Sequence, residues 1–452
     1  MLYYLKRGED MEKSISTFFN KALLHNDIKN QLYKDYDVKK GLRNEDGTGV
    51  LVGLTTIADV VGYTMVEGVK TDSIGDLYYR GISIKDIIDH KGSRLIYEEV
   101  CFLILFGYLP NTQELDAFTQ QLRLRYHLPE DFLQSQILRH PAANLMNKLQ
   151  QDILALYAYD EKADDVSPFN TLEQGLNLLA RLMSITIYDY HVKVHHFDHQ
   201  SLYIHHIKED YSIAENILYL LRPDQTFSEN EASVLDTLLV LHADHGGGNN
   251  STFTNVVISS TGTDIYSAFA GSVGSLKGPR HGGANLAARK MMLEVMKEIG
   301  MTEDRDMIRN MIIKILNKEA NDHSGLVYGM GHAIYTLSDP RSELMARECE
   351  KLAIEKGRTE EYHFYRLFDR IASETIKEIK GTQVCSNFDF YSGLVYDMLG
   401  IPTDLYPLLF VVSRSVGWLA HNIENKLYAD RIIRPATQYV GKIKKYIDLS
   451  KR

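Results

Sequence analysis

The stretch Met291-Met-Leu-Glu-Val-Met-Lys-Glu-Ile299 repeats apolar side chains at steps of three and four residues. These apolar positions are Met292, Val295, Met296 and Ile299. Such spacing places them along one face of an α-helix. Ile213-Ala-Glu-Asn-Ile-Leu-Tyr-Leu-Leu221 follows the same pattern, and helical periodicity continues through most of the chain. The sequence therefore predicts an all-α fold.

Evidence for β-structure is confined to the N-terminal part of the chain. Gly49-Val-Leu-Val-Gly-Leu-Thr-Thr-Ile57 is β-rich in composition, and Asp76-Leu-Tyr-Tyr-Arg-Gly81 is typical of one strand of a hairpin. Ser83 then offers a helix cap, with Asp86 in the first turn. We expect a minor β hairpin here. A charged, helical N-terminal extension over residues 1–45 is expected to precede it.

The overall composition excludes several classes of protein. The chain has 452 residues and a formal net charge of −10, which disfavours a nucleic-acid partner. Its three widely spaced cysteines are typical of a reducing compartment rather than a disulfide framework. No stretch approaches the ~20 apolar residues that span a bilayer, and the first residues lack the apolar core of a signal peptide. We expect a cytoplasmic protein with no membrane or nucleic-acid partner.

Two histidines and one aspartate stand beside glycines in segments far apart in the sequence. His281 lies in Gly278-Pro-Arg-His-Gly-Gly-Ala-Asn285, and His332 in Gly329-Met-Gly-His. Asp389 lies in Asn387-Phe-Asp-Phe-Tyr-Ser-Gly393. A carboxylate base with imidazole donors is what proton abstraction next to a carbonyl requires. Each residue alone also fits a structural explanation, because histidines are common in glycine-rich loops and aspartates cap helices.

Three arginines suggest an anionic ligand. Arg414 interrupts the apolar run from Leu408 to Trp418, and a buried guanidinium is costly unless it is paired. Arg341 and Arg434 stand next to prolines. Because an arginine fork can hold a carboxylate by two bonds, the set suggests a small polycarboxylate, with structural salt bridges as the alternative.

His242-Ala-Asp-His245 has two histidines three residues apart, a spacing that also occurs in metal sites. No glutamate completes a His-Glu-x-x-His motif, and no cysteine is nearby. We therefore expect no metal, and contacts to a bound anion instead.

Together these segments resemble the citrate synthase family. The resemblance rests on an ordered series of motifs: His242-Ala-Asp-His-Gly-Gly-Gly-Asn249, Gly278–Asn285, Gly329–His332, Asp339-Pro-Arg341, Asn387–Gly393, Ser413-Arg-Ser-Val-Gly-Trp418 and Arg434-Pro435. Weaker similarity runs from Leu77 to Gly441, about four-fifths of the chain. Single motifs are modest, but their shared order and spacing are highly specific.

The resemblance implies a two-domain, almost all-α homodimer. The large domain would comprise residues 46–282 and 400–452, and the small domain residues 283–399. The small domain would close over oxaloacetate and create the acetyl-CoA site. The charged N-terminal segment is unlike a β-rich regulatory domain, which favours a dimer over a hexamer.

The resemblance also implies a role for each site residue. Asp389 would remove a methyl proton from acetyl-CoA, His281 would donate a hydrogen bond to the thioester oxygen, and His332 would protonate the oxaloacetate carbonyl. Carboxylates would be held by His245, Arg341 and Arg414, with Arg434 reaching into the partner's site. The backbone around Val327, Gly329 and Met330 would receive the CoA adenine. No tightly bound cofactor is implied.

Some positions depart from the family pattern. Thr336 stands where many members carry a cation associated with CoA phosphates, and Lys380 or Arg280 could replace that cation. The approach Gly381-Thr-Gln-Val-Cys-Ser386 is also unusual.

Other functions remain open at this point. They are 2-methylcitrate synthesis from propionyl-CoA, a non-catalytic sensing or assembly role on the same fold, and a metal-dependent reaction.

Overall fold

The structure, a computed structural model, describes residues 15–24, 27–66, 69–279, 281–429 and 431–451. The side chains of residues 65–70 are not described. The chain divides into two compact units. One comprises Met1–Val52 and Arg434–Arg452, and the other comprises Gly53–Ile433. All predicted site residues except Arg434 belong to the second unit.

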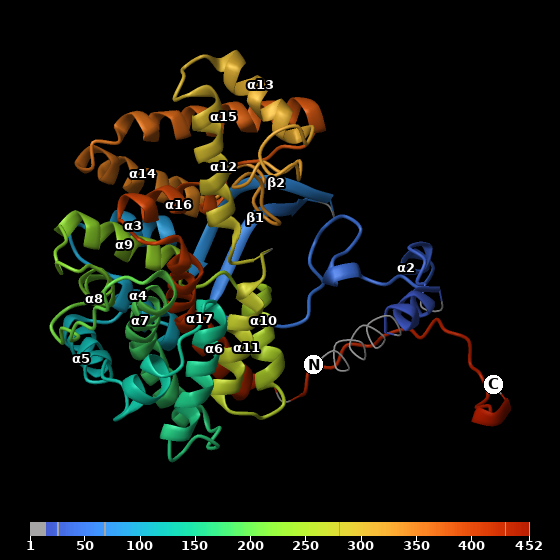
Figure 1. Cartoon of the computed structure of the whole chain (residues 1–452), viewed down its shortest axis with the longest axis horizontal. Helices are drawn as coiled ribbons and strands as arrows, with labels where there is room; N and C mark the ends of the chain where they lie inside the picture. Colours follow the sequence, from blue (N-terminus) through green and yellow to red (C-terminus); the bar gives the residue numbers. More distant parts are fainter. Residues whose placement is uncertain (1–14, 25–26, 67–68, 280, 430, 452) are drawn as a thin grey trace, which may run out of the picture. The chain divides into compact units, whose positions relative to one another are not determined.

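The second unit is built almost entirely of helices, which confirms the predicted fold class (Figure 1). Its α-helices are α3 (Ile84–Asp89), α4 (Tyr97–Phe106), α5 (Thr112–Arg123), α6 (Leu145–Leu156), α7 (Pro168–Asp198), α8 (Ile213–Leu221), α9 (Glu229–His242), α10 (Asn250–Ser259), α11 (Ile265–Lys277), α12 (Ala284–Ile299), α13 (Arg305–Leu316), α14 (Pro340–Glu355), α15 (Thr359–Lys380), α16 (Phe388–Met398) and α17 (Tyr406–Tyr428). Three short helical turns, η2 (Leu133–Leu138), η3 (Tyr157–Tyr159) and η4 (Thr403–Leu405), connect them.

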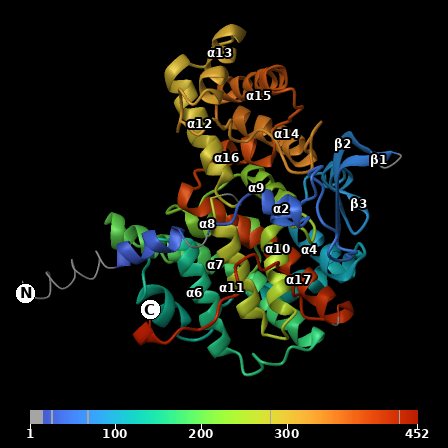
Figure 2. The ribbon, with the colours of Figure 1, turned by 90° about the vertical axis from the view of Figure 1, so that its right-hand side faces the viewer.

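Two groups of helices occupy opposite ends of this unit. Helices α12–α16 gather at one end in both views, and α6, α7, α10 and α11 towards the other (Figures 1 and 2). Helix α17 packs against α7, α9 and α10, and all of its residues from Leu408 to Asn422 are buried. The predicted domain limits at residues 283 and 399 coincide with the ends of the α12–α16 group, and the division itself stays a prediction.

Helix α12 contains the periodic stretch that indicated the fold class. It runs from Ala284 to Ile299, with Met292 and Val295 buried. Helix α8 begins at Ile213, the first residue of the predicted periodic stretch. Ser212 accepts a hydrogen bond from the Glu215 amide, and the Glu215 side chain accepts one from the Ser212 amide. This reciprocal cap satisfies two amides that the first turn leaves unpaired.

Residues 58–83, in the N-terminal part of the sequence, form a three-stranded antiparallel sheet of order β1-β2-β3. Its strands are β1 (Ala58–Val66), β2 (Val69–Tyr79) and β3 (Ile82–Ser83). The minor hairpin is therefore confirmed, and Ser83 caps α3 by accepting from the Lys85 amide at 3.2 Å. The expectation of strand structure over residues 49–57 was wrong. That segment pairs with no strand in the described residues, and Leu51 and Leu54 are exposed.

The first unit contains a helix over residues 15–24, α2 (Gln31–Asp35) and two short turns, η1 (Lys40–Leu42) and η5 (Leu449–Lys451). Part of the predicted N-terminal extension, residues 1–14, lies outside the described residues. No helix within the described ranges combines the length and apolarity needed to cross a membrane.

Candidate active site

Asp389 lies in the first turn of α16, but it does not cap that helix. The cap is Asn387, whose side chain accepts from the Asp389 amide at 3.0 Å. The half-buried Asp389 carboxylate accepts no hydrogen bond from any described residue. Burial raises its pKa to about 6, opposed by the nearby Arg341 charge and reinforced by Asp339. A weakly solvated carboxylate of this kind is a stronger base than an exposed one.

Two loop segments join the region of His332 to the start of α16. The Asn387 amide donates to the Gly329 carbonyl, and the Gly331 amide donates to the Cys385 carbonyl, both at 2.8 Å. The Asn387 side-chain amide also donates to the Gly331 carbonyl at 2.8 Å. These three bonds define a clamp between residues 329–331 and 385–387. The clamp fixes the two segments that carry His332 and Asp389 against each other.

Glycine is required within this clamp at residue 329. Gly329 has φ +80°, in the left-handed region, and a Cβ there would lie 2.8 Å from the Phe390 Cβ. Only glycine allows both this backbone conformation and this close approach. Phe390, the residue after Asp389 in α16, therefore packs directly on the backbone of the loop that leads to His332.

The environment of His332 determines which of its ring nitrogens carries the proton. Its Nδ1 accepts from the amides of Ile334 and Tyr335 at 3.1 and 3.2 Å. The neutral ring must then carry its proton on Nε2. The ring stacks on Tyr335, with centroids 4.7 Å apart, and meets His245 edge-on at 5.2 Å. His332 is thus oriented as a hydrogen-bond donor through Nε2.

His281 lies in the loop before α12, where the sequence predicted it. Its Nε2 lies 3.1 Å from both the Asn249 side-chain oxygen and the Ser251 hydroxyl. Burial, followed by the Arg414 charge, lowers its pKa to about 4. The imidazole is therefore neutral at ordinary pH and can act as a donor without carrying charge.

Arg341 is buried at the start of α14 and is paired within its own turn. Its Nε and one terminal nitrogen donate to the two oxygens of Asp339 at 3.0 and 2.7 Å. Asp339 also caps α14 by accepting from the Arg341 amide. The guanidinium lies over the rings of Tyr335 and Phe388. Asp339 thus fixes Arg341 beside the ring of Phe388, the residue before Asp389.

Arg414 is fully buried in α17 and forms no ion pair within 4 Å among the described residues. Its Nε donates to the His242 carbonyl, but one terminal nitrogen has no hydrogen-bond partner. Burial lowers its pKa to about 10, partly offset by the Asp244 charge. Since an unpaired buried guanidinium is costly, this atom is a strong candidate for contact with a ligand anion.

Phe410 lies one turn before Arg414 in α17, and its ring contacts several residues of the candidate site. The Arg414 guanidinium lies 4.8 Å from its ring centroid, and His281 meets the ring edge at 5.7 Å. His242 stacks on it at 4.2 Å and also contacts Phe388, the neighbour of Asp389. Segments that are distant in the sequence therefore meet around one aromatic ring.

Two imidazoles in this region also have unpaired buried nitrogens. His245 Nε2 and His242 Nδ1 have no hydrogen-bond partner among the described residues. Burial keeps the pKa of both rings well below the usual histidine range. The described residues contain no group of three or more His, Cys, Asp or Glu side chains placed to hold a metal ion.

The predicted contacts to CoA begin in the segment that leads to His332. Val327 and Gly329 are buried and Met330 is half-buried, in the segment leading to His332. Thr336 is half-buried, and its hydroxyl has no partner among the described residues. Arg434 is exposed and belongs to the other unit. Lys380 is exposed at the end of α15, and Arg280 lies outside the described residues.

Sequence reasoning missed the residues that hold the site residues in place. Asp339, Asn249 and Ser251 contact Arg341 or His281 directly. The Asp-Pro pair before Arg341 was a usable signal, because aspartate before proline is typical of a helix start. Asn249 and Ser251 carry the same kind of signal at the start of α10.

Comparisons with known proteins agree with this geometry. The family profile described as citrate synthase, C-terminal domain, matches residues 46–436. A citrate synthase of Haloferax volcanii is 34% identical over 410 residues, covering 90% of this chain and 96% of the relative. A 2-methylcitrate synthase of Shewanella oneidensis is 33% identical, covering 86% and 95%.

A solved structure extends the likeness to the whole fold. The citrate synthase of Thermoplasma acidophilum, in a ternary complex with carboxymethyl coenzyme A and oxaloacetate, superposes with a TM-score of 0.75 at 26% identity. It covers 92% of this chain, and this chain covers 99% of it. The chain described here therefore belongs to the citrate synthase family.

Proposed function

We propose that this protein condenses acetyl-CoA with oxaloacetate and hydrolyses the resulting citryl-CoA to citrate and CoA. The observation that carries the proposal is the state of Asp389. It is a half-buried carboxylate with a raised pKa, left unbonded at a helix start that Asn387 caps. The clamp joins it to His332, whose Nδ1 accepts from two backbone amides, and the neutral His281 lies across the same aromatic cluster.

Oxaloacetate would be held through its two carboxylates. Arg414 offers a buried guanidinium nitrogen without a partner, and His245 offers an unpaired ring nitrogen. Arg341 adds a second buried cation, which Asp339 holds in a fixed direction. A dianion would neutralise charge that the chain leaves uncompensated, so its binding gains strength from the low local dielectric.

Asp389 would then take a proton from the methyl group of acetyl-CoA. The thioester oxygen takes up the negative charge as an enolate oxygen and receives a hydrogen bond from His281, which stabilises it. For His281 to donate from Nδ1, its Nε2 must accept. The Ser251 hydroxyl lies 3.1 Å from Nε2 but donates to the Asn249 side-chain oxygen at 2.9 Å, so its proton would have to turn from Asn249 to His281. A positioned donor at such an oxygen is worth about 3–4 kcal/mol in comparable sites.

The enol carbon would attack the ketone carbon of oxaloacetate. As the new carbon–carbon bond forms, the ketone oxygen takes a proton from His332 Nε2, the nitrogen that carries it in this structure. Water then cleaves the thioester bond of citryl-CoA, which releases the CoA thiol and the third carboxylate of citrate.

The coenzyme and the assembly complete the proposal. The backbone at Val327, Gly329 and Met330 would receive the adenine of CoA, and Arg434 would contact the substrate bound by the other subunit of a homodimer. Thr336 supplies no cation for the CoA phosphates. We place the enzyme in the cytoplasm, at the entry of acetyl groups into the tricarboxylic acid cycle.

The test is release of thiol from acetyl-CoA. We expect release only when oxaloacetate is present, and no change when a chelator is added. Absence of release by the purified protein would overturn the proposal. Propionyl-CoA, assayed in parallel, tests the 2-methylcitrate reaction of the Shewanella oneidensis relative. One methylene shifts discrimination by only about 1–3 kcal/mol, so the ratio of the two kcat/KM values decides between the substrates.

A further inference from the structure

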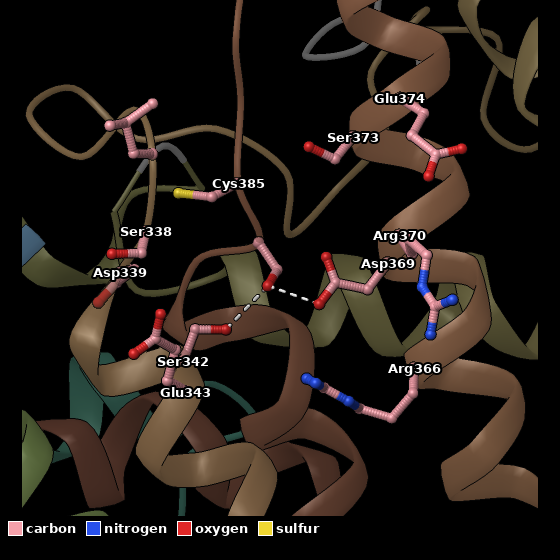
Figure 3. Close-up of a pocket in the computed structure, with 12 residues that line it drawn as sticks. Ser338, Asp339, Ser342, Glu343, Arg366, Asp369, Arg370, Ser373, Glu374 and Cys385 are labelled. Atoms are coloured by element: carbon pink, nitrogen blue, oxygen red, sulfur yellow. Dashed lines mark hydrogen bonds between the residues drawn. The ribbon is translucent and has the colours of Figure 1, made fainter. Parts of the chain in front are cut away.

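A cavity of about 380 Å³ lies between α14, α15 and the segment before α16. Figure 3 shows its polar lining: Ser342 and Glu343 come from α14, and Arg366, Asp369, Arg370 and Ser373 come from α15. None of His281, His332 and Asp389 lines it. The cavity therefore lies beside the candidate active site: it shares Cys385 and Ser386 with the clamp, and Asp339, the partner of Arg341, also lines it.

A network of short hydrogen bonds crosses this cavity wall. Asp369 Oδ2 accepts from the hydroxyls of Ser386 and Tyr391, both at 2.8 Å. These two residues flank Asp389 on its N-terminal and C-terminal sides. A single carboxylate oxygen thus holds both the entry to α16 and its first turn.

The network extends to the helix that carries Arg341. The Ser342 hydroxyl lies 3.0 Å from that of Ser386 (Figure 3). Because the Ser386 proton points to Asp369, Ser342 is the donor in this bond. Ser342 directly follows Arg341 in α14, so Ser386 also connects the two helix starts that face the proposed substrate.

Helix α15 makes a further contact with the segment before α16, residues 384–386. Ser373, one turn after Asp369, donates to the Val384 carbonyl. On the opposite side of the segment, Cys385 and Asn387 form the clamp with residues 329–331. The segment is therefore fixed between α15 and the His332 loop.

The Asp369 carboxylate has no cation of its own within 4 Å among the described residues. Arg366 instead donates to the Tyr391 hydroxyl at 3.1 Å and lies over the Tyr391 ring. Burial raises the Asp369 pKa, against the hydrogen bonds from Tyr391 and Ser386. A half-buried carboxylate that accepts two hydroxyl bonds and has no paired cation adds little to stability, but it fixes where the two hydroxyls lie.

We propose that Asp369 is a positioning residue for the condensation, because through Ser386 and Tyr391 it fixes the start of α16 that presents Asp389. It touches neither substrate. The inference rests on the proposed function and deepens it, since it assigns a further residue to the same reaction.

The direct test compares Asp369→Ala with Asp369→Asn and the wild type. Misplacement of a base by about 1 Å can cost roughly 100-fold in rate, so we expect kcat of Asp369→Ala to fall about 10- to 100-fold. The KM for oxaloacetate should change little. Asparagine keeps an oxygen that accepts both hydroxyl bonds, so Asp369→Asn should stay within about threefold of the wild type.

The pH profile adds a readout that a purely structural role would not move. The charged groups that act on Asp389 are Arg341 and Asp339 of α14. Neither is altered in Asp369→Ala, but a loosened α16 start admits water to Asp389. The acid limb of kcat should therefore shift to lower pH in Asp369→Ala and stay in place in Asp369→Asn.

Glu374→Gln is the matched control. Glu374 lies in the same helix and lines the same cavity, but it pairs with Arg305 instead of the network. Its removal should leave kcat and the pH profile unchanged. If Asp369→Ala does not fold, Ser386→Ala and Tyr391→Phe, which remove one donor each, carry the same test.

The outcomes separate this inference from the proposed function. An active wild type with an Asp369→Ala variant of equal kcat and equal acid limb overturns the positioning role. An inactive wild type overturns the proposed function itself.

Discussion

Asp389 is ionised only above the pKa that burial gives it, about 6. A base must be deprotonated to act, so kcat/KM for acetyl-CoA should fall tenfold per pH unit as pH drops below that value. His281, with a pKa lowered to about 4, stays neutral throughout this range. A pH–rate profile checks the prediction, with Asp389→Glu as the control in which the limb should move. An acid limb near pH 4 in the wild type would contradict the account.

Arg414 and Arg341 should respond differently to replacement by methionine. Arg414 leaves a terminal nitrogen unpaired, so Arg414→Met removes an uncompensated buried charge and should not lower Tm. Its loss should raise the oxaloacetate KM by about two to three orders of magnitude, or about 3–4 kcal/mol, through a missing carboxylate partner.

Arg341→Met is the matched control for this comparison. It leaves the buried Asp339 without the two side-chain bonds it now accepts, so Tm should fall. Calorimetry and steady-state kinetics on both variants provide the measurement. A lower Tm for Arg414→Met with an unchanged KM would make Arg414 a structural residue.

At the scale of elements, the contact between Gly329 and α16 is a sensitive point. Alanine there suffers both the left-handed backbone and a clash with Phe390, so α16 must shift. Gly329→Ala should lose about 1–3 kcal/mol of stability from backbone strain and, in addition, much of its kcat. Gly357 has φ +64° and open space around it. Gly357→Ala should therefore lose stability alone, and equal kcat values for the two variants would count against the clamp.

The elements also show how far sequence reasoning reached. Helical periodicity was sufficient for α8 and α12, because their apolar faces are local patterns. The strand expected over residues 49–57 was wrong, since β-rich composition does not specify a partner. Strand β1 begins only at Ala58, where β2 pairs with it.

The site residues also differ in how far the sequence alone could identify them. His281, His332 and Asp389 stand in glycine-rich motifs, and this made them visible as candidates. Asp369 lies inside the long helix α15 and Ser342 in the first turn of α14, and neither has a local signal of its contacts. Their hydrogen bonds to the start of α16 depend on how three helices pack, which a single sequence does not reveal.

At the scale of the whole molecule, Arg434 offers a test of assembly. We expect it to serve the partner's site. Mixing inactive Asp389→Ala and Arg434→Ala subunits should then restore about 25% of wild-type activity, because half of the dimers are mixed and each has one intact site. If Arg434 serves its own site, the mixture stays inactive. Mass measurement of the mixed sample establishes that subunits have exchanged.

The central claim is that Asp389 performs proton abstraction in an oxaloacetate-dependent condensation. The most direct measurement is thiol release from acetyl-CoA by the wild type and by Asp389→Asn, which has the same shape but no basic carboxylate. We predict release by the wild type only with oxaloacetate, and a kcat lower by about 100- to 10,000-fold in the variant. Undiminished release by a folded Asp389→Asn protein would contradict the claim.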